Sequence, residues 1–148
     1  MAYAILGQRE TVLTSRLNSY QLREMQVDDI QNSLALDQTD LQRQLSASAE
    51  GQASELGDLY GELADLTSDS EVARNRINAE INEIKEYYTG IEEDINQQVY
   101  AVQMKENIYD MEKGRLETQI EKVNKEMETV EKALSAGIEQ ATPNYGGQ

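Results

Sequence analysis

The chain has 148 residues, contains no His, Cys, Trp or Phe, and carries a formal net charge of −15. Without His or Cys it can form neither a Ser–His or Cys–His nucleophile nor a structural zinc site, so we expect no enzyme, no metal centre and no cofactor. The acidic excess disfavours nucleic acid and anionic lipid as main partners and favours a basic protein partner.

The apolar content indicates a thin structure rather than a thick core. Hydrophobic residues make up 39% of the chain, and its only aromatic residues are eight Tyr. Compact cores normally use aromatic side chains for much of their buried area. Long paired helices need only Leu, Ile, Val, Met and Ala along one row, and these are the residues that the sequence supplies.

The first predicted elements are a short leader and a long helix. Residues 1–7 are mildly apolar, and they lack the length and the basic start of a secretory signal peptide. No apolar run approaches the ~20 residues of a membrane span. A helix is predicted over 8–66, with one apolar row seven residues apart and a mixed, largely polar row four positions further on. The apolar row consists of Leu6, Leu13, Tyr20, Val27, Leu34 and Leu41.

Three weaker segments punctuate the chain. Residues 46–57, SASAEGQASELG, are rich in small residues that lower helix propensity, and they are read either as frayed helix or as a flexible joint. A turn is predicted at 67–70, where Ser68 and Glu71 have the spacing of a capping box. A second long helix is predicted over 71–139. Residues 140–148 contain Pro and Gly without periodicity, which predicts a mobile tail.

The most regular stretch of the chain lies in the second helix. Its apolar residues recur at steps of three and four, as on a helix that packs against another helix. This predicted packing seam consists of Leu116, Ile120, Val123, Met127, Val130, Leu134 and Ile138. Glu112, Glu117, Glu126 and Glu131 flank it, so pairing with its own copy along this seam would bring acidic edges together.

The first helix offers a complementary basic edge. In an antiparallel hairpin Arg9 can meet Glu126, Arg16 can meet Gln119, and Arg23 can meet Glu112. The three pairs share one midpoint, at residues 67–68, where the turn is predicted independently. The sequence therefore predicts an all-α fold, a long antiparallel helical hairpin of the coiled-coil type. Because two helices with a half-polar first arm are marginal alone, we also expect a homo-oligomer formed through the coiled-coil faces, or a helical protein partner.

The acidic clusters at 28–29 and 92–94 do not change this interpretation. They lack the ligand spacing and central Gly of an EF-hand loop, so they are read as solvated helix faces rather than metal sites.

The whole chain resembles the filament, needle and rod subunits that are exported by type III or flagellar-type secretion systems. The resemblance lies in the acidic, Cys-free, Gln/Asn/Ser-rich composition and in the terminal coiled-coil layout, including VEKALSAGIEQA. It implies a structural protein that self-assembles into an extracellular filament or appendage after signal-less export. The alternative is a cytoplasmic helical-hairpin adaptor, chaperone or stalk protein in a secretion or viral assembly.

Overall fold

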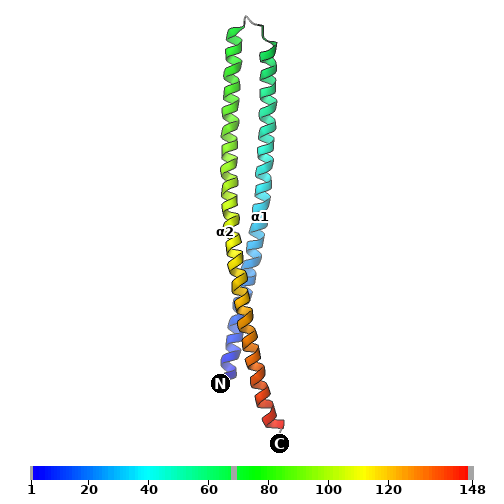
Figure 1. Cartoon of the computed structure of the whole chain (residues 1–148), viewed down its shortest axis with the longest axis vertical. Coiled ribbons are helices and arrows are strands. Elements are labelled where there is room, and N and C mark those ends of the chain that lie inside the picture. Colours follow the sequence, from blue (N-terminus) through cyan, green and yellow to red (C-terminus); the bar gives the residue numbers. More distant parts are fainter. Residues whose placement is uncertain (1, 68–69, 147–148) are drawn as a thin grey trace. The chain divides into compact units, whose positions relative to one another are not determined.

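The computed structural model describes the backbone of residues 2–67 and 70–146 and the side chains of 4–67 and 70–137. It contains two helices, α1 (Ala2–Asp65) and α2 (Glu71–Gly146), of 64 and 76 residues. They pack against each other as an antiparallel hairpin with no strand in the described ranges, which confirms the predicted fold class (Figure 1). The chain forms two compact units, a first unit of Met1–Asn32 with Asn107–Gln148 and a second unit of Ser33–Glu106.

The hairpin is built on one buried apolar row from each helix. In α1, Leu13, Val27, Leu34 and Leu41 are buried, while Leu6 and Tyr20 of the same row are half-buried. These residues lie seven apart along the helix, which is the spacing that keeps one helix face against a partner helix. Polar and charged side chains cover most of the remaining surface of α1, because a two-helix structure buries only one face of each helix.

Each unit has its own core cluster. In the first unit Leu13 is buried with Val123 and Val130, and the half-buried residues Leu6, Leu17, Tyr20, Met127 and Leu134 pack around them. In the second unit Leu59 is buried with Ile77 and Ile81, and the half-buried residues Leu56, Leu63, Leu66 and Ile84 surround them. In both clusters the buried side chains come from the two helices.

The helices extend further than the sequence pattern predicts. Residues 2–7 belong to α1, where Ala and Leu favour the helix and Leu6 packs on the first core cluster. Residues 140–146, predicted as an irregular tail, belong to α2 and include Pro143. Pro143 lacks the N–H donor that a helix interior uses and crowds the preceding turn, yet the backbone of these residues is helical.

The predicted soft segment is a continuous part of α1. Residues 46–57 are helical throughout, and no described Gly has a positive φ. The structure therefore shows regular helix here, and no joint interrupts α1 between residues 46 and 57. Gly51 of this segment lies opposite a large residue: a Cβ added to it would lie 3.0 Å from the hydroxyl oxygen of Tyr88 on α2.

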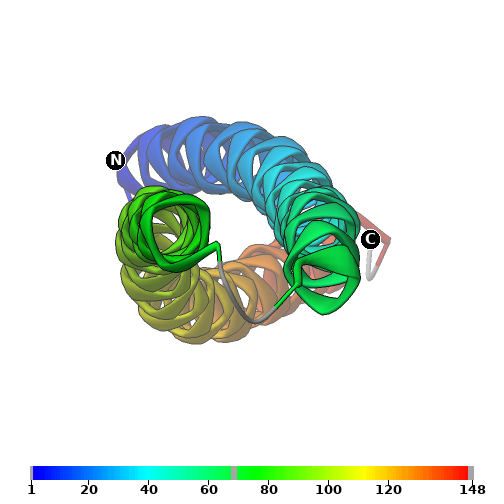
Figure 2. The same cartoon turned by 90° about the horizontal axis from the view of Figure 1, so that it is seen from above.

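The connection between the helices lies where the turn is predicted. The Ser70 amide donates to the Thr67 carbonyl at 3.2 Å, and the Arg74 amide donates to the Ser70 carbonyl at 3.0 Å. The second bond is the first helical bond of α2, so Ser70 occupies its N-cap position. Ser68 lies outside the described residues. Seen end-on in Figure 2, the last turn of α1 and the first turn of α2 lie apart from each other.

Candidate interaction surfaces

The predicted packing seam of α2 divides into a buried row and a half-buried row. Leu116, Val123 and Val130 are 6–8% exposed, whereas Ile120, Met127 and Leu134 are half-buried. Met127 and Leu134 of this half-buried row pack on the cluster of Leu13, Val123 and Val130. The side chain of Ile138 lies outside the described residues. Of the α1 residues predicted to meet this seam, Leu13 and Val27 are fully enclosed.

Two of the three predicted register pairs lie in contact. The Arg9 Nη2 atom lies 2.6 Å from Glu126 Oε2. Arg23 contacts Glu112 through two bonds, with Nε donating to Oε1 at 2.5 Å and Nη2 donating to Oε2 at 3.1 Å. Arg16 and Gln119 form no hydrogen bond among the described side chains, and Arg16 is exposed.

The Arg23–Glu112 pair has the closer geometry of the two. Two parallel bonds between a guanidinium and a carboxylate fix their relative orientation as well as their distance. The bond from Arg23 lowers the pKa of the Glu112 carboxyl below its ordinary value, and the same bond raises the pKa of Arg23. Arg9 and Glu126 are about half exposed, so we assign this second pair a role in alignment rather than in stability.

Two further cross-helix contacts escaped the sequence reasoning. The Lys113 Nζ atom lies 2.9 Å from Asp28 Oδ1, and the Gln31 side-chain amide donates to Asp110 Oδ1 at 2.7 Å. Its partner Asp28 raises the pKa of Lys113, first through the hydrogen bond and then through its charge. Lys113 and Gln31 occupy inner heptad positions, whereas the predicted pairs all lie along the helix edge that carries Arg9, Arg16 and Arg23. The sequence signal that could have predicted these two contacts is a polar residue at an inner heptad position with an acidic residue opposite it on the other helix.

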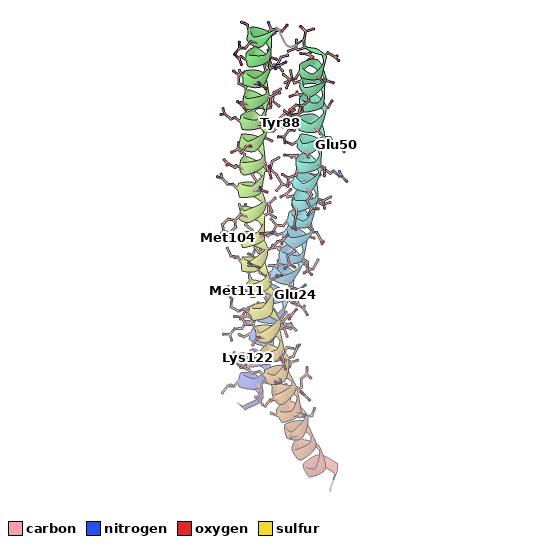
Figure 3. The ribbon with its side chains drawn as sticks, turned by 45° about the horizontal axis from the view of Figure 1, so that its top comes forward. Glu24, Glu50, Tyr88, Met104, Met111 and Lys122 are labelled. Atoms are coloured by element: carbon pink, nitrogen blue, oxygen red, sulfur yellow. The ribbon has the colours of Figure 1, made fainter. Side chains whose placement is uncertain are left out.

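In the second unit Tyr88 lies between the two helical segments (Figure 3). Its ring packs beside Gly51, and burial raises the pKa of its hydroxyl, with the nearby charge of Glu55 acting in the same direction. Tyr87 packs edge-on against Tyr88 with ring centroids 5.2 Å apart, and its own side chain is exposed. The half-buried ring with a polar tip is the arrangement that the seam-edge position of Tyr88 requires.

Large apolar side chains also lie on the outside of both units. The first unit exposes Ile5, Val12, Leu22, Met25, Ile108 and Met111, and the second exposes Leu36, Tyr60, Val72, Tyr87, Tyr100 and Met104. They equal in number the buried apolar residues of the described chain, and further large apolar side chains such as Leu17 and Ile84 are half-buried.

The described residues offer no metal site and no membrane span. No group of three or more acidic side chains is placed to hold a metal ion in that part of the chain. Within the same residues, neither α1 nor α2 has a stretch both long and apolar enough to cross a bilayer. Comparison with protein-family models, with curated proteins and with solved structures found no match to this chain.

Proposed function

We propose that this protein is a structural subunit that assembles with copies of itself into a filament or appendage outside the cell, and that it has no catalytic role. The observation that carries the proposal is the outward exposure of large apolar side chains on both units, with residues such as Leu22 and Met25 more than half exposed. Large apolar side chains that stay exposed on a hairpin whose inner rows are already paired favour contact with another protein.

The uneven coverage of the seam supports the same proposal. Ile120, Met127 and Leu134 remain half-buried although they belong to the most regular apolar row of the chain. A third helix packed along this edge would complete their burial, as happens when hairpins associate into bundles. A homo-oligomer supplies such helices without any further gene product.

The composition supports export by a signal-less machine. The chain resembles type III and flagellar-type subunits in its acidic, Cys-free, Gln- and Asn-rich sequence. Its core consists of thin aliphatic rows rather than an aromatic globular interior, which suits a subunit that must pass through a narrow channel in extended or helical form and pack again outside.

The physical state of the purified chain tests self-assembly. We expect light scattering to show a mass that rises with protein concentration and negative-stain electron microscopy to show elongated assemblies. A constant monomer or dimer mass over the whole range, especially one that captures a defined second protein, would support the adaptor or chaperone alternative instead. Antibody detection in the medium or cell-surface fraction of the native organism tests export, and confinement to the cytosol would refute it.

A further inference from the structure

One edge of the first unit has positive charge between its two ion pairs. The contacts of Arg9 and Arg23 with glutamates of α2 show that the two helices meet along this edge. Arg16 lies midway between these arginines, seven residues from each, so the helical repeat places it on the same edge. It is exposed and forms no ion pair with another described residue.

Two further basic residues lie on the α2 side of this edge. Arg115 lies three residues after Glu112, and Lys122 lies four residues before Glu126, which are the steps that keep side chains on one side of a helix. Both are exposed beside the buried row of α2, and neither forms an ion pair with another described residue. We name Arg16, Arg115 and Lys122 the basic patch, and Figure 3 labels Lys122.

In the second unit one edge carries acidic residues on both helices. Gln44 of α1 and Gln98 of α2 line one groove between the helices, which marks where this edge lies. Glu55 follows Gln44 by eleven residues, about three helical turns, and Glu83 precedes Gln98 by fifteen, about four turns. Further acidic residues lie three or four positions from these two. We name the whole set the acidic patch: Glu55, Asp58, Glu62, Glu80 and Glu83.

The acidic patch lies beside the core cluster of the second unit. Asp58 is the sequence neighbour of the buried Leu59, and Glu80 is the neighbour of the buried Ile81. All five carboxylates are exposed, and none forms an ion pair with another described residue. Like charges at this spacing repel one another, so the edge is electrostatically unfavourable until a positively charged group docks on it.

We propose that the basic patch in the first unit of one copy docks on the acidic patch in the second unit of another copy. This inference rests on the proposed self-assembly and names the surfaces that carry it. An exposed apolar side chain adjoins each patch: Val12 lies four residues before Arg16, and Tyr87 lies four residues after Glu83. These side chains add apolar contact to the charge complementarity that directs the encounter.

The charges favour a copy of the chain over other occupants of the acidic patch. Among the described residues no acidic group is placed to hold a metal ion, so a bound cation is not indicated. A chain with a formal net charge of −15 repels its own copies unless a surface of locally opposite charge brings them together. The basic patch is such a surface, and it is present in every copy at the same concentration as the acidic patch.

The contact is heterologous, because the two patches differ and lie in different units. A copy that is bound through its basic patch still presents its acidic patch to a further copy. Such contacts repeat until the assembly closes on itself or extends as a fibre. The same pair of patches can therefore build the filament that we propose, without a second kind of interface.

Charge reversal tests the contact in the full chain. The basic-patch variant carries Arg16→Glu with Lys122→Glu, and the acidic-patch variant carries Asp58→Lys with Glu83→Lys. At low salt each variant alone should self-associate about tenfold more weakly than the wild type, or worse, because like charges then face each other. An equimolar mixture should recover near wild-type association, since each altered patch then meets a patch of opposite charge.

Matched controls separate this effect from the change in net charge. Lys125→Glu with Lys132→Glu makes the same change on α2 of the first unit, away from the edge that carries the basic patch. Glu86→Lys with Glu93→Lys does the same for the second unit. We expect both controls to associate more strongly than the corresponding patch variant. Sedimentation equilibrium measures association, and circular dichroism checks that helicity is unchanged.

Zero-length cross-linking of the wild type tests which residues meet. A carbodiimide joins a lysine amine directly to a carboxylate that it contacts, and a mixture of unlabelled and heavy-isotope copies identifies links between two copies by mass spectrometry. Lys122 of one copy should be linked to Asp58, Glu80 or Glu83 of another. Lys132, which contacts Glu128 of its own helix at 3.3 Å, should be linked mainly within one copy. Links between copies that join Lys122 only to carboxylates of the first unit would overturn the proposal.

The outcomes separate this inference from the proposed function. If the wild type assembles and the patch variants assemble as well as their controls, self-assembly uses another surface and the inference fails. If the mixture recovers but the mass stops at a dimer, the contact holds and the filament fails. If the wild type stays monomeric at every concentration, both fail.

Discussion

Replacing Leu13 by Ala tests the central claim that the hairpin depends on enclosed residues of one apolar row. Leu13 is 0% exposed and lies in a cluster with Val123 and Val130. The change removes three buried carbons at about 0.8 kcal/mol each, or roughly 2.4 kcal/mol before any cavity is counted. Half-buried neighbours such as Leu17 and Tyr20 can move into the space, so we expect a loss of about 2–3 kcal/mol, near the lower end for such changes.

Leu22→Ala is the matched control, because it makes the same chemical change on the same helix at a side chain that is 57% exposed. The gain in helix propensity is shared by both variants and cancels in the comparison. We expect the control to lose no more than about 0.5 kcal/mol. Guanidinium unfolding followed by circular dichroism, at concentrations below self-association, measures both values. A difference between the two variants of less than about 1 kcal/mol would refute the enclosure of Leu13 in solution.

Three further predictions concern other contacts. Glu112→Gln should lower the melting temperature at pH 7, because the ionised Glu112 carboxylate stabilises the fold through its bond with Arg23. The difference from the wild type should disappear as the pH falls well below 4.5, since the stabilisation is lost when the carboxylate protonates. A difference that stays constant with pH, or that the control variant Glu131→Gln reproduces, would contradict this. Gly57→Ala, whose new Cβ meets nothing within 4 Å, should stabilise the folded chain by about 0.5–1 kcal/mol. Gly51→Ala should stabilise it by less, because the ring of Tyr88 must move. If chemical denaturation gives the reverse order, the contact between Gly51 and Tyr88 is excluded. Arg9→Glu should lower the melting temperature slightly, and adding Glu126→Arg should restore it, whereas additive losses would place the two residues apart.

The sequence predicted the fold class because the signals for it were redundant. The row from Leu6 to Leu41 and the seam from Leu116 to Ile138 each predict a helix packed against another helix, and the turn near residue 67 together with the arginine and glutamate edges makes the two antiparallel. The cross-helix contacts were harder to predict. The predicted pairs lie along one helix edge, whereas Lys113 and Gln31 reach from inner positions to acidic residues across the seam.

Local propensity was the weakest guide. It marked residues 46–57 as soft because small residues pack little when each helix is considered alone. In the hairpin Gly51 lies beside the ring of Tyr88, so the absence of a side chain at this position follows from what lies opposite. That information is non-local, and a propensity scale evaluated along one helix does not contain it.

The polar contacts within the first unit have a mechanical consequence. Apolar rows with a seven-residue repeat tolerate sliding of one helix along the other, since a step of one heptad again brings apolar residues together. A step in one direction would place Arg23 opposite Gln119 and Asp28 opposite Ile120. A step in the other would place Arg23 opposite Lys105 and Asp28 opposite Glu106. Either step loses the Arg23–Glu112 and Lys113–Asp28 pairs. These contacts therefore resist sliding of one helix along the other when the hairpin is pulled along its axis.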